Sequence, residues 1–241
     1  MKGLIPAAGK GTRMRPFTLA YPKELLPVGT KAVIEHVIET MKKAGIEEIV
    51  VVVGWKQHAI LDYLGSGERL DVDITYVVQD DRNGLAGAVK TGEDAVDGES
   101  FAVILGDNYL TDCDALKELK EFHNSNGWEA TIGSFKVDDP TSYGIIDGED
   151  GHVNGLVEKP SREEAPSDEG IAGIYVFEPS IFDAIEKIGR GKGNEYQLTD
   201  AIDLLRKETD KIGYMRIPGD HIDVGTPERL RKANREYDLR D

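Results

Sequence analysis

The segment GLIPAAGKGTRMR, residues 3–15, joins a short apolar run to a loop with two glycines and three cationic side chains. Backbone N–H groups beside glycines can approach an anion closely, and arginine supplies a forked pair of donors, so this composition predicts a phosphate-binding loop. Its spacing matches neither common glycine loop. Gly11 stands where a P-loop requires Ser or Thr after its Lys, and Met14 stands where a dinucleotide fingerprint requires its third glycine. A glycine turn with solvated cations is the alternative interpretation of this loop on its own.

Two aspartates follow apolar runs elsewhere in the chain. Asp107 ends the run FAVILGD, and Asp223 follows the short apolar stretch before GTPE. Ligands of open α/β sheets bind beyond the carboxyl ends of strands, so the topology can bring both carboxylates to the phosphate loop. Two carboxylates beside phosphate oxygens favour Mg²⁺. The local alternative is that each Asp only begins a turn; Thr226 and Pro227 are typical of a helix start.

Other reaction classes lack candidate residues. The five histidines have no spacing suited to zinc and are expected mostly at the surface. No nucleophile elbow and no Ser–His–Asp arrangement is evident, so the sequence offers no candidate for nucleophilic catalysis. The string DCD at Asp112–Asp114 matches the DxD metal motif of many glycosyltransferases, but its position favours the start of a helix.

The pattern of apolar residues predicts the elements that position these side chains. Strands are expected at 2–7, 47–54, 72–78 and 101–107, and helices at 31–45, 57–64, 85–96 and 112–127. This alternation predicts an α/β fold with a Rossmann-like, doubly wound, mainly parallel mixed sheet. An elaboration at one edge is expected from strands at 129–137, 151–159 and 172–177 and helices at 179–188, 197–208 and 227–238. With no linker and no hexapeptide repeat, we expect a single domain over residues 1–241 and no β-helix extension.

Composition narrows the classes of partner and location. The chain has 241 residues, a formal net charge of −16 and one cysteine. Such a charge without a basic stripe argues against nucleic acid as a partner. The longest apolar run is too short to span a membrane, no signal peptide begins the chain, and the lone cysteine fits a reducing compartment, so a cytoplasmic protein that binds no membrane is expected. Against this background, a basic cluster indicates an anionic ligand: Lys10, Arg13, Arg15 and Lys23.

Taken in order, these stretches resemble the sugar-1-phosphate nucleotidylyltransferase family, in the branch with glucose-1-phosphate thymidylyltransferases and UTP–glucose-1-phosphate uridylyltransferases. The resemblance covers nearly the whole chain. Its first two motifs together are highly specific, whereas EKP or GDN alone would mean little. The matching motifs are AAGKGTRMRPFT (7–18), PKELLPV (22–28), QDDRNGLAGA (79–88), LGDN (105–108), YGII (143–146), EKP (158–160), NEYQLTDAI (194–202) and DVGTPE (223–228).

This resemblance implies a reaction. An NTP, either dTTP or UTP, and a sugar 1-phosphate, expected to be glucose 1-phosphate, would give an NDP-sugar and pyrophosphate. The sugar phosphate would attack the α-phosphorus in line with Mg²⁺ assistance, which requires no protein nucleophile. Uracil and thymine present the same pairing edge, so the sequence leaves the base open. It also leaves open the identity of the sugar and a possible homo-oligomer.

The resemblance assigns the nucleotide and the catalytic cations to specific residues. Arg13 would neutralise charge on the departing pyrophosphate, and Lys23 would hold the sugar phosphate near the α-phosphate. These two are the expected catalytic residues. The expected nucleotide-binding residues are Ala8, Gly9, Gly11, Thr12 and Arg13 in the first loop, with Gln79 and Gly84 at the base.

The sugar phosphate and the metal are assigned in the same way. Gly144 and Glu158 would hold sugar hydroxyls, and Lys159, together with Lys23, would reach the sugar phosphate. The expected ligands of Mg²⁺ are Asp107 and Asp223.

A non-catalytic sugar-nucleotide sensor or regulatory subunit of the same fold is the alternative function. A sensor could lack Arg13, Lys23 or one Asp of the expected metal pair, whereas all of them are present. The chain departs from the family at His221, since thymidylyltransferases often carry Trp two residues before the metal-binding Asp. That difference bears on a stacking contact with glucose rather than on metal binding.

Overall fold

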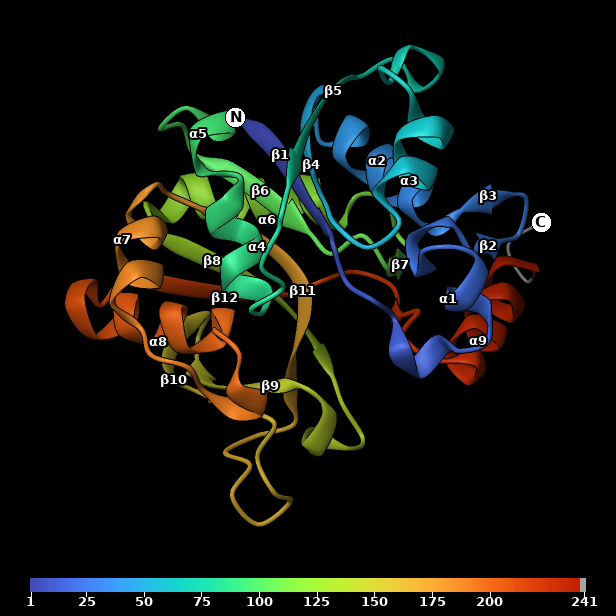
Figure 1. The fold of residues 1–241 in the computed structure, drawn as a ribbon. Coiled ribbons are helices and arrows are strands. Elements are labelled where there is room, and N and C mark those ends of the chain that lie inside the picture. Colours follow the sequence, from blue (N-terminus) through green and yellow to red (C-terminus); the bar gives the residue numbers. More distant parts are fainter. Residues whose placement is uncertain (239–241) are drawn as a thin grey trace.

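A nine-stranded sheet runs through residues 1–238, which are the residues that this computed structural model describes (Figure 1). The last three residues of the predicted 1–241 domain lie outside the described residues. The strand order is β5-β4-β1-β6-β11-β8-β12-β10-β9. The strands are β1 (Lys2–Ala7), β4 (Glu48–Val53), β5 (Asp73–Val78), β6 (Phe101–Ile104), β8 (Ala130–Lys136), β9 (Gly144–Glu149), β10 (His152–Glu158), β11 (Glu169–Phe177) and β12 (Ile212–Arg216).

The sheet has a parallel half and a mostly antiparallel half. Strands β5, β4, β1 and β6 are parallel to one another, so the predicted parallel arrangement holds for this half. Beyond it, β11 is antiparallel to both β6 and β8, only the β8–β12 pair is parallel, and β10 is antiparallel to β12 and β9. Strand β9 also pairs back to β11, at Ile145 opposite Gly170, which closes five strands into a small barrel. The predicted mainly parallel arrangement is therefore found only in the N-terminal strands, and the C-terminal strands are mostly antiparallel.

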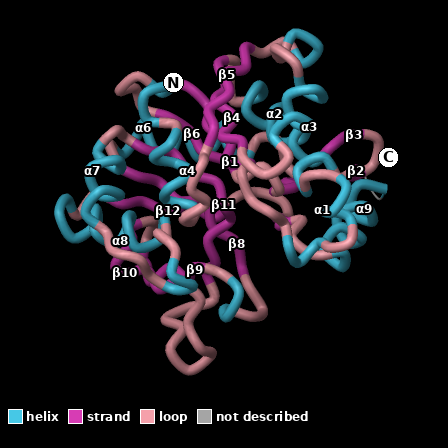
Figure 2. Tube along the Cα trace, viewed as in Figure 1, coloured by secondary structure: helices cyan, strands magenta, loops and turns pink. Residues whose placement is uncertain are grey.

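Helices cover both faces of the sheet (Figures 1 and 2). One face packs against α2 (Val33–Lys43), α3 (Gln57–Leu64) and α6 (Ala115–Asn126), and the other against α4 (Leu85–Thr91), α5 (Glu93–Val96), α7 (Ser180–Lys187) and α8 (Leu198–Thr209). In β4, Val50 and Val52 join one apolar cluster while Val51 and Val53 join the other. A strand covered on both faces must be apolar throughout, which explains the unbroken run at 49–53.

A third apolar cluster lies beside the main sheet and is built around the C-terminal helix α9 (Pro227–Asp238). This helix packs near two small β-pairs, one of β2 (Pro27–Val28) and β3 (Lys31–Ala32), the other of β7 (Asn108–Leu110) and β13 (His221–Asp223). The pairing of β7 with β13 holds Asp223 opposite Asn108. Remaining short elements are α1 (Phe17–Ala20) and 3-10 turns at Thr12–Met14, Lys23–Leu25, Glu68–Leu70, Pro140–Ser142 and Lys192–Asn194.

Most predicted elements form close to their expected bounds. The helix expected at 85–96 is divided into α4 and α5 at Gly92, a residue type that weakens helices. Strands β9 and β12, which complete the barrel, were not predicted. Within residues 1–238, none of the helices combines the length and apolar character needed to cross a bilayer.

Candidate active site

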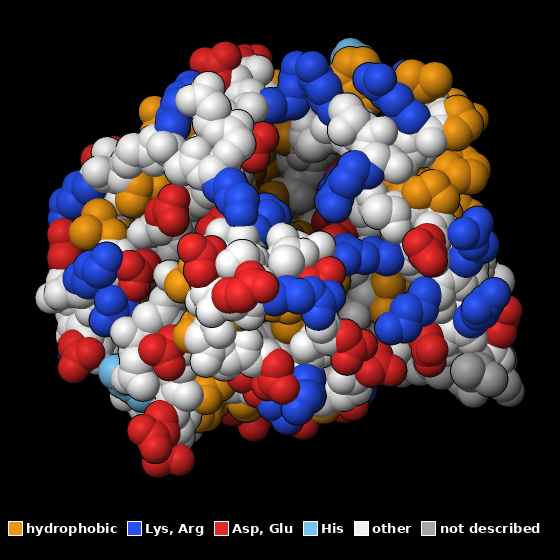
Figure 3. Space-filling model, turned by 90° about the horizontal axis from the view of Figure 1, so that it is seen from below, with side chains coloured by type: hydrophobic (Ala, Val, Ile, Leu, Met, Phe, Trp, Pro, Cys, Tyr) orange, Lys and Arg blue, Asp and Glu red, His pale blue; other side chains and the backbone are white. Residues whose placement is uncertain are grey.

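A cavity of about 690 Å³ opens beyond the carboxyl ends of β1, β5 and β6 and extends to the barrel strands β9–β11. Figure 3 shows a hollow in this face of the molecule with Lys and Arg side chains at its border, although the chain as a whole has a formal net charge of −16. Every site residue predicted from the sequence lines the cavity: Ala8, Gly9, Gly11, Thr12, Arg13, Lys23, Gln79, Gly84, Asp107, Gly144, Glu158, Lys159 and Asp223.

The glycine loop follows β1 directly and forms one wall. Gly11 has a φ of 57°, a left-handed conformation that favours glycine. Its carbonyl accepts hydrogen bonds from the backbone N–H of Met14 at 2.9 Å and from the buried Thr18 hydroxyl at 2.7 Å. Met14 is buried below the loop, so the turn that carries it presents Arg13 to the cavity. Arg15, the fourth member of the predicted basic cluster, does not line the cavity.

Arg13 lies beside the second carboxylate. A Cβ built on Gly225 would lie 3.0 Å from Arg13 Nη2 and 2.7 Å from Asp223 Oδ1, so the guanidinium and the carboxylate flank the same stretch of backbone. Within residues 1–238, the salt bridges leave Arg13 without an acidic partner. Its cation is therefore available to a ligand.

Lys23 occupies the centre of the charged region. Its ammonium donates to Asp107 Oδ2 in a largely buried ion pair. Burial would lower the pKa of Lys23, but the carboxylates of Asp107, Glu24 and Asp223 raise it above the usual value. The lysine therefore remains a cation in a site with an excess of carboxylates.

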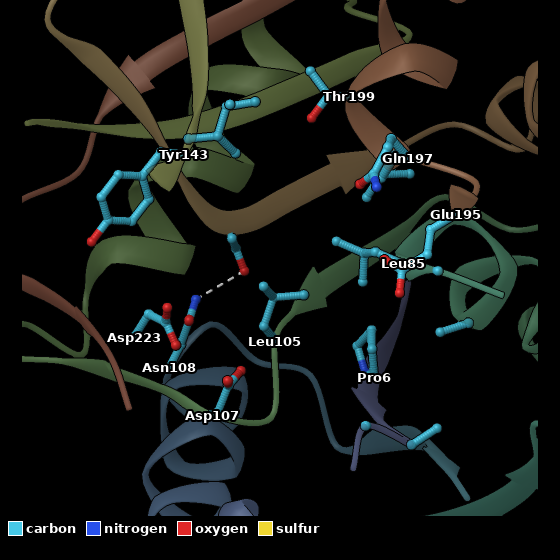
Figure 4. A pocket seen from close by; sticks show the side chains of 18 of the residues that line it. Pro6, Leu85, Leu105, Asp107, Asn108, Tyr143, Glu195, Gln197, Thr199 and Asp223 are labelled. Carbon is cyan, nitrogen blue, oxygen red and sulfur yellow. Dashed lines mark hydrogen bonds between the residues drawn. The ribbon is translucent and has the colours of Figure 1, made fainter. Parts of the chain in front are cut away.

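The two carboxylates expected to bind metal converge in the cavity (Figure 4). Burial would raise the pKa of Asp107, but the neighbouring Lys23 outweighs burial and holds it below its usual value. Burial and the charge of Asp107 raise the pKa of Asp223, whose Oδ2 accepts from Arg229 Nη1 at 2.6 Å. Two anions are thus held close together and only partly neutralised. Among residues 1–238, no group of three or more His, Cys, Asp or Glu side chains could hold a metal, so the pair would need ligands from substrate or water.

The helix start expected after Asp223 is also present. Thr226 Oγ1 accepts from the backbone N–H of Arg229 at 3.3 Å, and Pro227 begins α9. The helix start is therefore confirmed, and the metal-binding role of Asp223 stays a prediction.

At the barrel side of the cavity, Glu158 is held at both oxygens. Thr199 Oγ1 donates to Oε2 at 2.7 Å, and Lys159 Nζ donates to Oε1 at 2.6 Å. Glu158 ends β10 and pairs with Gly144 at the start of β9, which places both residues at the cavity. Lys159 has a φ of 46°, an uncommon conformation for a residue other than glycine. This end presents a fixed carboxylate, an ammonium and backbone groups, which suits polyhydroxylated ligands.

At the opposite end, Gln79 follows β5 and is buried at the cavity wall. Its Nε2 donates to Asn83 Oδ1 at 3.2 Å, which orients the amide. Gly84 has a φ of 119°, and a Cβ there would lie 2.4 Å from the carbonyl oxygen of Tyr196. Glycine is therefore required where the 194–197 segment crosses the start of α4.

Several cavity residues were not predicted from the sequence. Glu24, Asn108 and His221 are buried, and each has a side-chain atom without a hydrogen-bond partner within the described chain. Figure 4 shows Glu195, Gln197 and Thr199 across the cavity from Asp107, Asn108 and Asp223. All but one of these residues lie inside the quoted motifs, which is the signal that could have identified them. His221, two residues before its motif, was noted as a departure from the family but was given no role.

The structure shows where the histidines and the DCD string at Asp112–Asp114 lie. The histidines were expected mostly at the surface, which is wrong for His123 and His221, since both are buried. Asp112 accepts from the backbone N–H of Asp114 at 2.8 Å, and Asp114 immediately precedes α6. The DCD string is thus a helix start, as expected, and it does not line the cavity.

Comparison with known proteins shows which family this chain resembles. The nucleotidyl transferase family model matches residues 2–239. A "low-salt glycan biosynthesis nucleotidyltransferase Agl11" from Haloferax volcanii is 39% identical over 97% of this chain, which spans 65% of that relative's length. "UTP–glucose-1-phosphate uridylyltransferase 2" from Staphylococcus saprophyticus is 37% identical and is matched over 100% of this chain and 92% of its own length.

A solved structure extends the similarity to three dimensions. The crystal structure of a UDP-glucose pyrophosphorylase complexed with UDP-glucose superimposes with a TM-score of 0.92 at 31% identity, and the match covers 100% of this chain and 99% of the other. The motifs, the fold and these matches agree over the full length. The chain therefore belongs to the nucleotidyl transferase family, in the branch of sugar-1-phosphate nucleotidylyltransferases.

Proposed function

We propose that the protein joins UTP and glucose 1-phosphate to give UDP-glucose and pyrophosphate, with dTTP as the alternative nucleotide. One observation carries the proposal: a single cavity holds the cations Arg13 and Lys23, the facing carboxylates Asp107 and Asp223, and the Gln79 amide. The names of the staphylococcal relative and of the similar crystal structure favour UTP over dTTP.

The proposed mechanism is an in-line displacement in which the protein positions and neutralises its substrates. A sugar phosphate oxygen attacks the α-phosphorus of the NTP, the bond to the bridging oxygen breaks, and pyrophosphate leaves. Gly9 and Gly11 present backbone N–H groups to the nucleotide phosphates. Lys23 holds the sugar phosphate against the α-phosphate, and Arg13 binds the charge that grows on the pyrophosphate.

The donor set fits Mg²⁺, which we propose is held by Asp107 and Asp223. Asp107 is buried and Asp223 is half-buried, and the two lie close enough that the charge of Asp107 raises the pKa of Asp223, so they favour a cation between them. Mg²⁺ accepts one or two carboxylates and takes its remaining ligands from phosphate oxygens and water. When bound, the ion would neutralise charge where the substrate phosphates meet. Lys23 and Arg229, the ion-pair partners of the two carboxylates, would then be free to contact phosphate oxygens.

We propose that the sugar binds at the barrel side of the cavity. Glu158, fixed by Thr199 and Lys159, accepts hydrogen bonds from sugar hydroxyls, and the Gly144 backbone lies beside it. Lys159 reaches the sugar phosphate. Asn108 Oδ1, which is buried without a partner, offers a further acceptor, because its Nδ2 is already bound to the carbonyls of Ala172 and Gly173.

Replacing Gln79 by Ala is expected to weaken base discrimination. With Nε2 turned to Asn83, the amide oxygen is left to accept from the N3–H of uracil or thymine, a donor that cytosine and adenine lack at that position. Loss of this bond should lower the preference for UTP over CTP and ATP in kcat/KM by about tenfold. Gln57→Ala, a control in the adjoining smaller pocket, should leave the preference unchanged. Equal ratios in the wild type and Gln79→Ala would contradict the role.

A substrate matrix tests the function itself. With Mg²⁺, the protein should release pyrophosphate from UTP or dTTP only when a hexose 1-phosphate is present, and the reaction should run backwards from NDP-glucose and pyrophosphate. Four NTPs assayed against several sugar 1-phosphates would identify the preferred pair. Folded protein that turns over none of the pairs would favour the sensor over the enzyme. A cytoplasmic location and a homo-oligomer stay predictions.

A further inference from the structure

Arg229 lies in the first turn of α9, and its side chain reaches back to Asp223. Its Nη1 donates to Asp223 Oδ2 at 2.6 Å, and the two side chains are 26% and 22% exposed, so the ion pair is only partly open to solvent. Asp223 lines the cavity, whereas Arg229 does not. The guanidinium therefore holds a carboxylate of the substrate site without belonging to the lining of that site.

The stability of α9 does not account for an arginine at this position. The N-terminal turn of a helix carries partial positive charge, so it favours Asp or Glu and disfavours a cation. Other residues attach α9 to the domain: Ala233 is buried in the third apolar cluster, and the Asn234 side chain bonds the backbone of Pro27 and Gly29. What Arg229 contributes is therefore its contact with Asp223.

Asp223 requires a counter-charge because a second carboxylate lies beside it. Burial and the charge of Asp107 raise the pKa of Asp223, whereas the nearby cations lower it. Lys23 is bonded to Asp107 instead. Within residues 1–238, Arg229 is the one cation that forms a salt bridge with Asp223. Arg229 thus supplies part of the positive charge that Mg²⁺ would supply when bound.

The guanidinium has a second partner that does not depend on Asp223. Its central carbon lies 5.2 Å from the centroid of the Tyr143 ring. That ring packs edge to face on Phe135 at 5.1 Å, and the Tyr143 carbonyl accepts from the backbone N–H of Lys159 at 2.9 Å. A cation over an aromatic ring is attracted to it. Arg229 therefore keeps one favourable contact when it gives up the carboxylate.

We propose that Arg229 is a positioning residue that neutralises Asp223 in the metal-free protein and yields this carboxylate to Mg²⁺, so that the metal binds firmly only together with the nucleotide. This inference rests on the function proposed above, because it assumes that Asp223 is a metal ligand. Two cations that compete for one carboxylate each lower the apparent affinity of the other. The nucleotide offsets this competition, because its phosphate oxygens offer the displaced guanidinium new acceptors.

The test follows Mn²⁺ binding to metal-free protein by electron paramagnetic resonance, without turnover. Arg229→Met keeps an apolar side chain against Tyr143 and removes the competing charge. The variant should bind Mn²⁺ about three- to fivefold more tightly than the wild type without nucleotide, the factor expected for a partly exposed ion pair. With saturating UTP, the difference should fall below about twofold.

Three further variants show whether the effect passes through Asp223. Arg229→Lys keeps the charge and should bind Mn²⁺ nearly as the wild type does. Arg231→Met removes an exposed arginine from the same helix and should leave Mn²⁺ affinity unchanged. In the Asp223→Asn background, Arg229→Met should no longer raise Mn²⁺ affinity, because the two residues act on the metal as a pair.

Thermal unfolding gives a second readout that a purely structural ion pair would not move. In EDTA, Arg229→Met leaves the two carboxylates with less counter-charge, so its Tm should lie slightly below that of the wild type. A ligand that binds the folded state more tightly stabilises it more. Added Mg²⁺ should therefore raise the Tm of Arg229→Met more than that of the wild type, whereas a structural ion pair predicts equal increases.

The outcomes distinguish this inference from the proposed function. If the wild type turns over UTP with glucose 1-phosphate and binds Mn²⁺, but Arg229→Met binds Mn²⁺ equally or more weakly, the inference is overturned and the proposed function stands. If the wild type turns over none of the substrate pairs and binds no Mn²⁺, the proposed function fails, and the inference fails with it. Tighter Mn²⁺ binding by Arg229→Met that disappears in the Asp223→Asn background supports the inference.

Discussion

Arg13→Ala is expected to lower kcat by about 10²- to 10³-fold, the loss typical of removing one charge-stabilising donor from an active site. Charge grows on the pyrophosphate as it leaves, so an interaction with that group strengthens in the transition state and affects kcat more than KM. Arg13 makes no ion pair within the described residues, so its removal should leave Tm nearly unchanged. Arg15→Ala is the matched control: it removes an arginine from the same loop outside the cavity and should retain wild-type kcat.

Lys23→Ala should behave differently, because Lys23 is part of a buried cluster. It contacts Asp107, and its loss leaves that carboxylate and Glu24 without their cation, so Tm should fall as well as kcat. The KM for the sugar phosphate should rise more than that for the NTP. Steady-state kinetics with each substrate varied in turn measure the difference. Identical changes for both substrates in the two variants would contradict the division of roles between Arg13 and Lys23.

The sequence predicts which residues line the cavity where a local pattern coincides with a general rule of topology. Asp107 and Asp223 each follow an apolar run, and the rule that ligands bind beyond strand ends brought them to one crevice. The glycine loop was predicted from composition, and its left-handed Gly11 gives the physical reason. Such features depend on a few neighbouring residues, so they can be read without knowing the rest of the fold.

The features of the fold and of the cavity that were not predicted depend on contacts between segments far apart in the sequence. The β7–β13 pair joins two three-residue strands, at 108–110 and 221–223, that are too short to produce a periodic signal. The barrel closes through a single pairing of Ile145 with Gly170, which no local pattern encodes. The histidines were expected mostly at the surface, yet Phe135, far away in the sequence, helps to bury His221.

Burial of titratable side chains was the property least accessible to sequence analysis. Glu24 lies in the quoted PKELLPV motif as one of many acidic residues, and nothing in its neighbours distinguishes it from a surface glutamate. In the structure it is 1% exposed, and burial raises its pKa to about 8. Its environment is set by Lys23 and by the 105–107 segment, so it emerges only when those segments meet.

Each of Asp107→Asn and Asp223→Asn is expected to abolish most turnover, by about 10²–10³-fold or more, since each removes a carboxylate from the proposed Mg²⁺ site. The substrates bring several negative charges together, and two further carboxylates would increase their repulsion without a divalent cation between them. The residues act as a unit, so the double variant should be little worse than either single variant. EDTA should stop the wild type, and added Mg²⁺ should restore it.

Measurements of Tm and of Mn²⁺ binding distinguish loss of the proposed metal site from loss of the fold in these variants. Asparagine matches the shape of aspartate, and Asp223→Asn removes a charge that repels Asp107 while it weakens the partly exposed ion pair with Arg229, so its Tm should stay near that of the wild type. Mn²⁺, used in place of Mg²⁺ and followed by electron paramagnetic resonance, should bind the wild type with UTP and bind both Asn variants far more weakly. Asp220→Asn, at an exposed neighbouring position, should behave like the wild type in both assays. If Asp223→Asn keeps wild-type rates and Mn²⁺ affinity while Asp107→Asn loses both, Asp223 serves only to pair with Arg229 before α9, and the two-carboxylate site is wrong.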